Sequence, residues 1–260
     1  MTFYLLLAKI KPDFNRLVSV SFSHYEMIMT TQTKRPNNTF LELIFNIALP
    51  SIILMKLSGD EYLGSVAALI VALLFPIGYG LYDFIKNKSM NFISLLGFLS
   101  TLLTGGIGLF ELDVEWLAIK EAAIPSAIGI VVLISGFWGK PLIAKVLLNP
   151  ILFNLTLIYQ TLLDQNNTEQ FKAKIHRANH LLSITFVFSA TMNYLLAKWI
   201  VVSPAGSTEF NEQLGEMTML SYPVIAIPSM LMLIAIMFYV VKSLMKLTGL
   251  KLDQILKTEQ

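Results

Sequence analysis

The chain has no cysteine, and only 14% of its 260 residues are charged. Without cysteine it forms no disulfide, holds no thiolate-bound metal and has no cysteine nucleophile. Soluble globular domains carry charge at about a quarter of their positions. The low charge content, together with 55% hydrophobic residues and a mean hydropathy of +0.66, excludes an ordinary soluble domain.

The motifs of common enzyme classes are also missing. The sequence has no P-loop and no dinucleotide-binding glycine pattern, and no Ser–His, paired-Asp or metal-ligand set falls within an apolar stretch. His176 and His180 have the spacing of metal ligands, but Arg177 stands where the HExxH motif has glutamate. We therefore expect no enzymatic activity, no cofactor and no metal. We also expect no nucleic-acid partner, because the basic residues follow the ends of apolar stretches instead of one polar face.

What the chain does contain is six apolar stretches of membrane-spanning length. A helix needs about 20 residues to cross ~30 Å of hydrocarbon, and a chain in lipid must satisfy its own backbone hydrogen bonds. We therefore expect an all-α, polytopic membrane helix bundle with six transmembrane helices. The expected spans are residues 39–57, 63–82, 92–110, 119–137, 181–202 and 220–241. The domain boundaries follow as an N-terminal segment 1–38, a transmembrane domain 39–241 that includes the loop 138–180, and a tail 242–260.

Lysine and arginine predict the orientation of these spans. Of the 19 basic residues, 16 lie in four segments, namely 1–38, 83–91, 138–180 and 242–260. The other three, Lys56, Lys120 and Lys198, lie at the ends of spans on the opposite side. Because basic residues concentrate in cytoplasmic loops, we expect both termini in the cytoplasm and an acidic, flexible outer loop at 203–219.

The N-terminal segment allows two interpretations. Residues 1–38 are mixed and polar, with Met27 and Met29 just before a polar run. They form either a weakly amphipathic surface segment or an extension upstream of the natural start. We favour the second interpretation, and N-terminal mass spectrometry of the natural protein would decide.

Polar side chains within the spans are the candidates for a functional site, because they are costly in lipid. They are Glu42, Asn46, Lys120, Glu121 and Asn193. In a transporter or channel they would line or gate a path for a small solute between spans one, four, five and six. The structural alternative places Glu42 at the membrane interface and lets Asn46 and Asn193 bond to neighbouring helices. Adjacent residues on a helix point about 100° apart, so we expect Lys120 and Glu121 not to pair, with the lysine extending outward to the interface.

A short motif occurs in three of the spans. Ala48–Ser51 reads ALPS, and Ala123–Ser126 and Ala226–Ser229 both read AIPS. A proline within a helix frees a carbonyl one turn earlier, so a true repeat predicts three kinked helices around an outward-facing cavity. The alternative is a chance match, because four such common residues carry little information.

The sequence WGKPLIAKVL at residues 138–147, directly after span four, resembles the KPLI signature of the bacterial intracellular septation protein A family. Trp116, Lys120 and Glu121 before that span, and the run from Phe171 through His180 into span five, also fit the resemblance. The chain differs from that family in its N-terminal segment, an insertion at 151–175 and its acidic outer loop. The resemblance implies a multi-pass protein of the bacterial inner membrane that serves cell-envelope maintenance or cell division. Its partners would be membrane lipids, other inner-membrane proteins or a second copy. The cytoplasmic surface that would make these contacts comprises Lys140, Pro141, Lys145, Lys172, Lys174 and Arg177.

Overall fold

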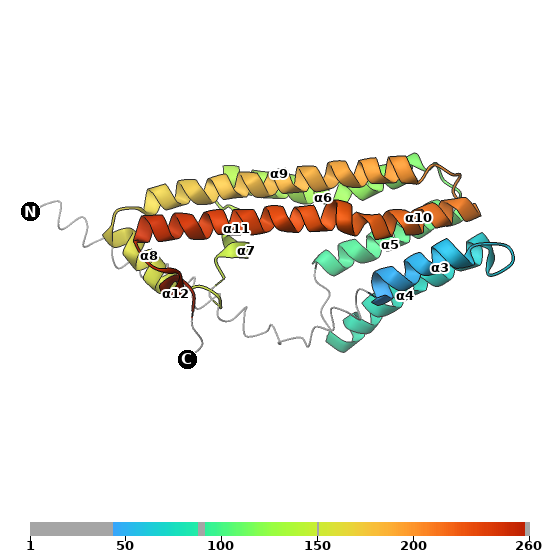
Figure 1. The fold of residues 1–260 in the computed structure, drawn as a ribbon, viewed down its shortest axis with the longest axis horizontal. Helices are drawn as coiled ribbons and strands as arrows, with labels where there is room; N and C mark the ends of the chain where they lie inside the picture. Colours follow the sequence, from blue (N-terminus) through green and yellow to red (C-terminus); the bar gives the residue numbers. More distant parts are fainter. Residues whose placement is uncertain (1–43, 88–91, 150, 258–260) are drawn as a thin grey trace, which may run out of the picture. The chain divides into compact units, whose positions relative to one another are not determined.

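A computed structural model describes residues 44–87, 92–149 and 151–257, which belong to one compact unit, Leu41–Gln260. Within these ranges the regular structure is helical, apart from an isolated β-bridge between Phe153 and Leu256 (Figure 1). The expected all-α class is therefore confirmed. The N-terminal segment, Glu42 and the first residues of span one lie outside the described residues.

The elements follow one another in chain order. They are the π-turn η1 (Ile44–Ala48), α3 (Leu49–Leu57), α4 (Gly64–Asn87), α5 (Phe92–Leu109), α6 (Glu115–Phe137), α7 (Leu142–Leu147), α8 (Leu155–Asp164), α9 (Thr168–Ile200), α10 (Thr208–Ser221), the π-turn η2 (Tyr222–Ala226), α11 (Ile227–Thr248) and α12 (Leu252–Ile255).

Four helical stretches of the described residues are long and apolar enough to cross a membrane. They are Gly64–Tyr82, Glu115–Phe137, Thr168–Ile200 and Thr208–Thr248, which contain or overlap the second, fourth, fifth and sixth expected spans. The other two spans correspond to shorter apolar helices, Asn46–Leu57 and Phe98–Leu109. The membrane character of the chain thus has structural support, whereas crossing by α3 and α5 stays a prediction.

The fifth and sixth helices are longer than the sequence predicted. Residues Thr168–Ile200 form one helix of 33 residues, and Thr208–Thr248 form a continuous helical stretch of 41. At 1.5 Å per residue these are about 50 Å and about 60 Å long, well beyond the ~30 Å of hydrocarbon. Both stretches are therefore longer than a helix needs to be to cross the apolar layer of a membrane.

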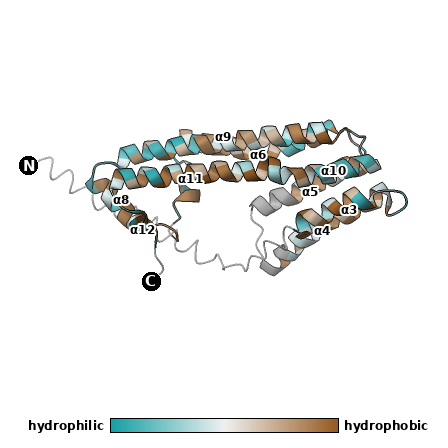
Figure 2. Cartoon of the chain, in the orientation of Figure 1, coloured by the Kyte–Doolittle hydropathy of each residue, from teal (hydrophilic) through white to brown (hydrophobic). Residues whose placement is uncertain are grey.

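The expected flexible loop at 203–219 is wrong, because most of it is helix α10. Figure 2 shows many polar residues on α10 and mainly hydrophobic ones along α11. The apolar residues Phe210, Leu214 and Met217 recur at helical spacing and are buried. The acidic residues of α10, Glu209, Glu212 and Glu216, lie on its exposed face. Average hydropathy hides such an amphipathic helix, whereas helical periodicity identifies it.

Hydrogen bonds show which helix ends lie together. At one end, which we call the acidic end, the Thr208 hydroxyl donates to the Ser58 carbonyl (3.1 Å) and Lys198 pairs with Glu115 (2.9 Å). The turns that follow α3, precede α6 and follow α9 therefore meet there. At the other end, the basic end, the side-chain amides of Gln165 and Asn167 donate to carbonyls of Thr248 and Leu247, both at 2.8 Å. The helices thus alternate in direction, as a chain that crosses a membrane repeatedly requires.

Two hydrophobic cores occupy these two ends. The core of the acidic end is built from α3, α4, α5, α6, α9 and α10, with Leu69, Leu117 and Phe210 almost completely buried. The core of the basic end joins α6, α9 and α11 to the short helices α7, α8 and α12. Because α6 and α9 contribute to both cores and share the most extensive contact between any two described helices, this pair connects the two ends.

Segment 138–180 contains two short helices, α7 and α8. Ile143 of α7 and Ile158 and Leu162 of α8 are buried inside the protein. Helix α7 packs on α6 and α9, and α8 packs on α9 and α11. Val146 of α7 and Leu163 of α8 lie on the opposite faces and are exposed. The stretch 171–180 is also part of helix α9, not of a loop.

The first and third copies of the short motif share one local structure. Ala48–Ser51 and Ala226–Ser229 each begin at the last residue of a five-residue π-turn, and each places its proline in the first turn of the next helix. Among the described residues, the buried hydroxyls of Ser51 and Ser229 have no hydrogen-bond partner. The middle copy, Ala123–Ser126, lies inside the regular helix α6.

Candidate functional site

The candidate site is a partly buried ion pair on α6 that reaches α5. The Lys120 Nζ atom lies 2.6 Å from Glu121 Oε1 and 2.6 Å from Thr104 Oγ1. The side chain of Lys120 is only 9% exposed and that of Glu121 only 23%. The prediction that Lys120 and Glu121 do not pair, and that the lysine extends outward, is therefore wrong.

The reason is the length of the lysine side chain. Its Cα–Cβ bond and that of Glu121 point in different directions around α6, but four methylene groups allow the ammonium to turn back to its neighbour. The partner Thr104 is level with Lys120 because α5 and α6 are antiparallel and joined by a short turn. Lys120 is five residues from the start of α6, and Thr104 is five residues from the end of α5, about 7.5 Å inside each helix end.

The hydrogen-bond directions in this cluster are fixed. The Thr104 hydroxyl donates to the Ser100 carbonyl (3.1 Å), so its oxygen accepts from the Lys120 ammonium. Lys120 therefore donates to both α5 and its own helix. The charges of Lys120 and Glu121 cancel, which lowers the cost of placing them in an apolar environment. Chemically, the cluster holds two opposite charges and one hydroxyl group within hydrogen-bond distance of the same ammonium.

An apolar layer lies next to this cluster on the side of the acidic end. Leu117 is one turn before Lys120 on α6, and it joins Phe210 of α10 and Leu69 of α4 in the core. Gly108 allows close packing there, since an added Cβ would lie 2.5 Å from Leu69 Cδ2 and 3.2 Å from Phe210 Cε1. Leu117 of this layer lies between Lys120 and the start of α6 at the acidic end.

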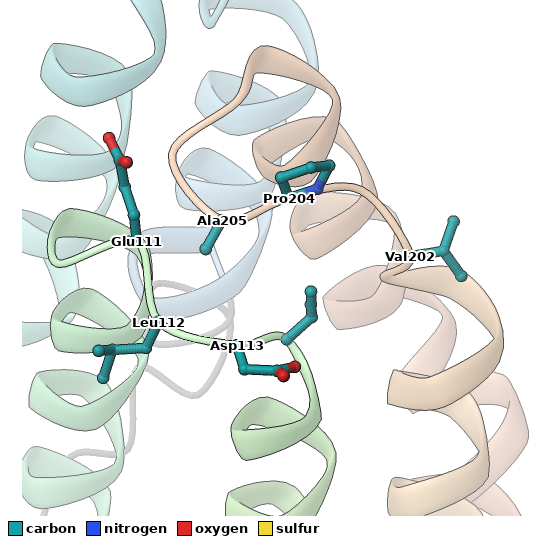
Figure 3. A pocket seen from close by; sticks show the side chains of 7 residues that line it. Glu111, Leu112, Asp113, Val202, Pro204 and Ala205 are labelled. Atoms are coloured by element: carbon teal, nitrogen blue, oxygen red, sulfur yellow. The ribbon is translucent and has the colours of Figure 1, made fainter.

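A shallow hollow lies outside that layer, between the α5–α6 turn and the α9–α10 turn (Figure 3). The carboxyl groups of Glu111 and Asp113 at its rim point in different directions. Its lining includes none of the polar residues that the sequence singled out within the spans. We therefore assign no ligand to it.

The other intramembrane candidates do not join the ion pair in any described contact. Asn193 donates to the carbonyl (2.8 Å) and hydroxyl (3.3 Å) of Ser189, one turn earlier in α9. The expected helix-to-helix bond of Asn193 is therefore wrong. Asn46 lies half-buried in η1, whose helix α3 packs mainly on α4 and α10.

The predicted cytoplasmic surface lies at the basic end. Pro141 precedes the first turn of α7, and Lys140, Lys145 and Arg177 are exposed around it. Exposed Lys172 pairs with Glu169 (2.6 Å), one turn earlier in α9. A sixth residue, Lys174, lies over the Tyr239 ring of α11, 6.0 Å from its centroid. The six residues thus come from α7, α9 and the turn before α7.

Sequence reasoning missed Asn179, which holds this end together. The completely buried side chain donates to the Val132 carbonyl of α6 (2.7 Å) and accepts from the Ile143 amide of α7 (3.2 Å). Gly136 makes room for it, because an added Cβ would lie 3.0 Å from Asn179 Nδ2. The surrounding charges of the stretch 171–180 obscured this residue. The sequence could have indicated Asn179 by its spacing. It follows Phe171 and Ile175 at intervals of four residues, so the three lie on the same buried face of α9.

A second buried asparagine performs the corresponding role at the acidic end. Asn211 of α10 donates to the Ser58 hydroxyl (3.1 Å) and to the Ser65 carbonyl (2.7 Å), on either side of the α3–α4 turn. No signal other than the periodicity of α10 identifies it.

The described residues contain no group of three or more His, Cys, Asp or Glu side chains that could hold a metal ion. His176 and His180 lie along α9, and the ring of His180 makes an edge contact with Phe137. Comparisons of the chain with models of protein families, with curated protein sequences and with solved structures find no match.

Proposed function

We propose that the chain is a non-enzymatic protein of the bacterial inner membrane, related to septation protein A, that serves cell-envelope maintenance or cell division. It acts through contacts of its basic end with other membrane proteins. The basic end then faces the cytoplasm, with six transmembrane helices above it, and the acidic end faces outward.

The observation that carries this proposal is the construction of the basic end. The surface that holds Lys140, Pro141 and Lys145 rests on α7, and α7 is bonded through Asn179 to α6 and α9. A surface held by two long helices presents its charges in a fixed arrangement, which favours specific contacts over general attraction to lipid. Exposed Trp138 beside these lysines is the residue type that anchors a helix at a membrane interface.

Deletion of the gene, combined with in vivo cross-linking from residues 138–180, tests the proposal. We expect abnormal cell length, division or osmotic tolerance, and cross-links to inner-membrane proteins. Charge reversal by Lys140→Glu with Lys145→Glu should reproduce the phenotype at normal membrane abundance. Lys251→Glu, an exposed lysine of the same end outside the proposed surface, is the matched control. Normal growth and division of the deletion strain would contradict the proposal.

The ion pair favours a second candidate, a transporter of a small solute. Charges within membrane helices are costly and are typical of solute paths, and Lys120 and Glu121 follow the buried apolar residue Leu117 on α6. Purified protein in proteoliposomes should then conduct or accumulate a small ion or solute, and Glu121→Gln should reduce the flux at least about tenfold, as expected for loss of a buried hydrogen-bonded charge. Equal fluxes in empty and protein-containing vesicles would contradict this candidate.

A further inference from the structure

We propose that Lys120, Glu121 and Thr104 form a proton-binding site. Uptake of a proton by Glu121 frees Lys120 from its ion pair and loosens α5 from α6. This inference goes beyond the proposed function and does not depend on it.

The first step is the position of the lysine between two helices. One ammonium group donates to Glu121 Oε1 and to Thr104 Oγ1, each at 2.6 Å. Because Thr104 belongs to α5 and Lys120 to α6, the ammonium ties the two helices together. Its place depends on the carboxylate, which supplies the only negative charge shown in contact with it among the described residues.

The second step is the identity of the group that takes up the proton. Glu121 is the more exposed member of the pair, 23% against 9% for Lys120. The ionised carboxylate can accept a proton, whereas the lysine ammonium is already fully protonated and has no lone pair to accept another. In the balanced step, one proton from solution adds to the Glu121 carboxylate. A neutral carboxylic acid and an unpaired ammonium result, and the net charge of the cluster changes from zero to +1.

The third step is that no neighbouring group among the described residues offsets this new charge. Helix α5 contains no charged residue, and neither does the stretch 64–82 of α4. On the packed neighbours, Lys56 and the acidic side chains of α10 are exposed, and Lys198 pairs with Glu115 at the helix ends. The tyrosines Tyr194 and Tyr222 are partly exposed. An unpaired ammonium in an apolar bundle is strongly unfavourable, so Lys120 turns toward the interface and its bond to Thr104 is lost.

The absence of cysteine from the chain allows a direct test. Spin labels at Leu99→Cys on α5 and Ile130→Cys on α6, both exposed positions (46% and 56%), report the distance between these helices in the full-length protein in lipid. We expect a shift to longer distances as the pH falls from about 8 to about 3, which is below the usual titration range of carboxyl groups. Glu121→Gln, which mimics the protonated acid, should show the long distance at every pH. If the distance does not change with pH in the spin-labelled protein that retains Lys120 and Glu121, the proposal is overturned.

Two controls separate this site from other titrating groups. Glu115→Gln removes the exposed ion pair at the start of the same helix, and the pH-dependent shift should persist. The double variant Lys120→Met with Glu121→Gln leaves no buried unpaired charge, so it should fold and lose the pH dependence. Infrared difference spectra should show a protonated-carboxyl band at low pH that is missing from Glu121→Gln. Persistence of the shift in the double variant, or of the band in Glu121→Gln, would contradict the assignment.

Discussion

Single buried residues determine how closely the helices of this protein approach. An added Cβ at Gly215 would lie 2.7 Å from Met55 Cγ and 2.8 Å from the Ser51 carbonyl oxygen, so α10 could not pack on α3 without moving. We expect Gly215→Ala to lower the free energy of unfolding by about 1–3 kcal/mol, as overpacking does. Gly78→Ala is the control, since nothing lies within 4 Å of its added Cβ. Thermal unfolding in detergent measures both, and equal midpoints would contradict the packing of α10 on α3.

Two asparagines of α9, Asn179 and Asn193, should differ sharply when replaced by alanine. Asn179→Ala removes bonds to α6 and α7 and leaves the buried Ile143 amide without a partner, which costs about 1–3 kcal/mol. Asn193→Ala loses only bonds to Ser189 within its own helix, so its effect should be small. Chemical unfolding compares them. A larger loss of stability in Asn193→Ala would show that Asn193 makes a contact beyond α9.

At the scale of elements, the two π-turns with a following proline are local weak points in otherwise regular helices. A π-turn loses ideal backbone geometry, and proline lacks the amide that would bond the preceding turn. We expect amides of η2 to exchange hydrogen faster than those of mid-α11. Pro228→Ala restores an amide donor and should slow that exchange. Pro125→Ala in α6 is the control, because its helix has no π-turn. Unchanged exchange in Pro228→Ala would show that the proline does not weaken η2.

The helices that the sequence predicted have apolar residues on all their faces. The helices that it missed have apolar residues on one face only. Hydropathy located α4, α6 and α11 because these helices are apolar over their length. It missed α10 and the first part of α9, where Phe210 and Asn179 lie on a buried face and charges occupy the other. The ion pair shows the same limit, since side-chain direction at the Cβ atom does not predict where a lysine ammonium lies. Asn46 and Asn193 were chosen for polarity alone, and polarity does not reveal a bonding partner.

At the scale of the molecule, the described helix ends divide by charge as well as by contact. The turns of the acidic end include Asp60, Glu61 and Asp113, whereas the basic end includes Lys140, Lys145 and Arg177. Since lysine and arginine remain on the cytoplasmic side during insertion, the two ends should face opposite compartments. The sequence predicted this division because it depends only on counting charges between apolar spans, which requires no knowledge of side-chain packing.

Cysteine labelling of whole cells measures that division directly. The chain lacks cysteine, so each single substitution provides the only thiol in the protein. A membrane-impermeant maleimide added to intact cells should label Asp60→Cys and leave Lys172→Cys unlabelled. Both should react after the membrane is permeabilised, because both residues are exposed. The charge difference between the ends supplies the physical reason, since each basic residue near anionic lipid contributes about 1 kcal/mol to keeping its segment on the cytoplasmic face. Labelling of Lys172→Cys in intact cells would reverse the orientation, and it would move the proposed docking surface to the outer side of the membrane.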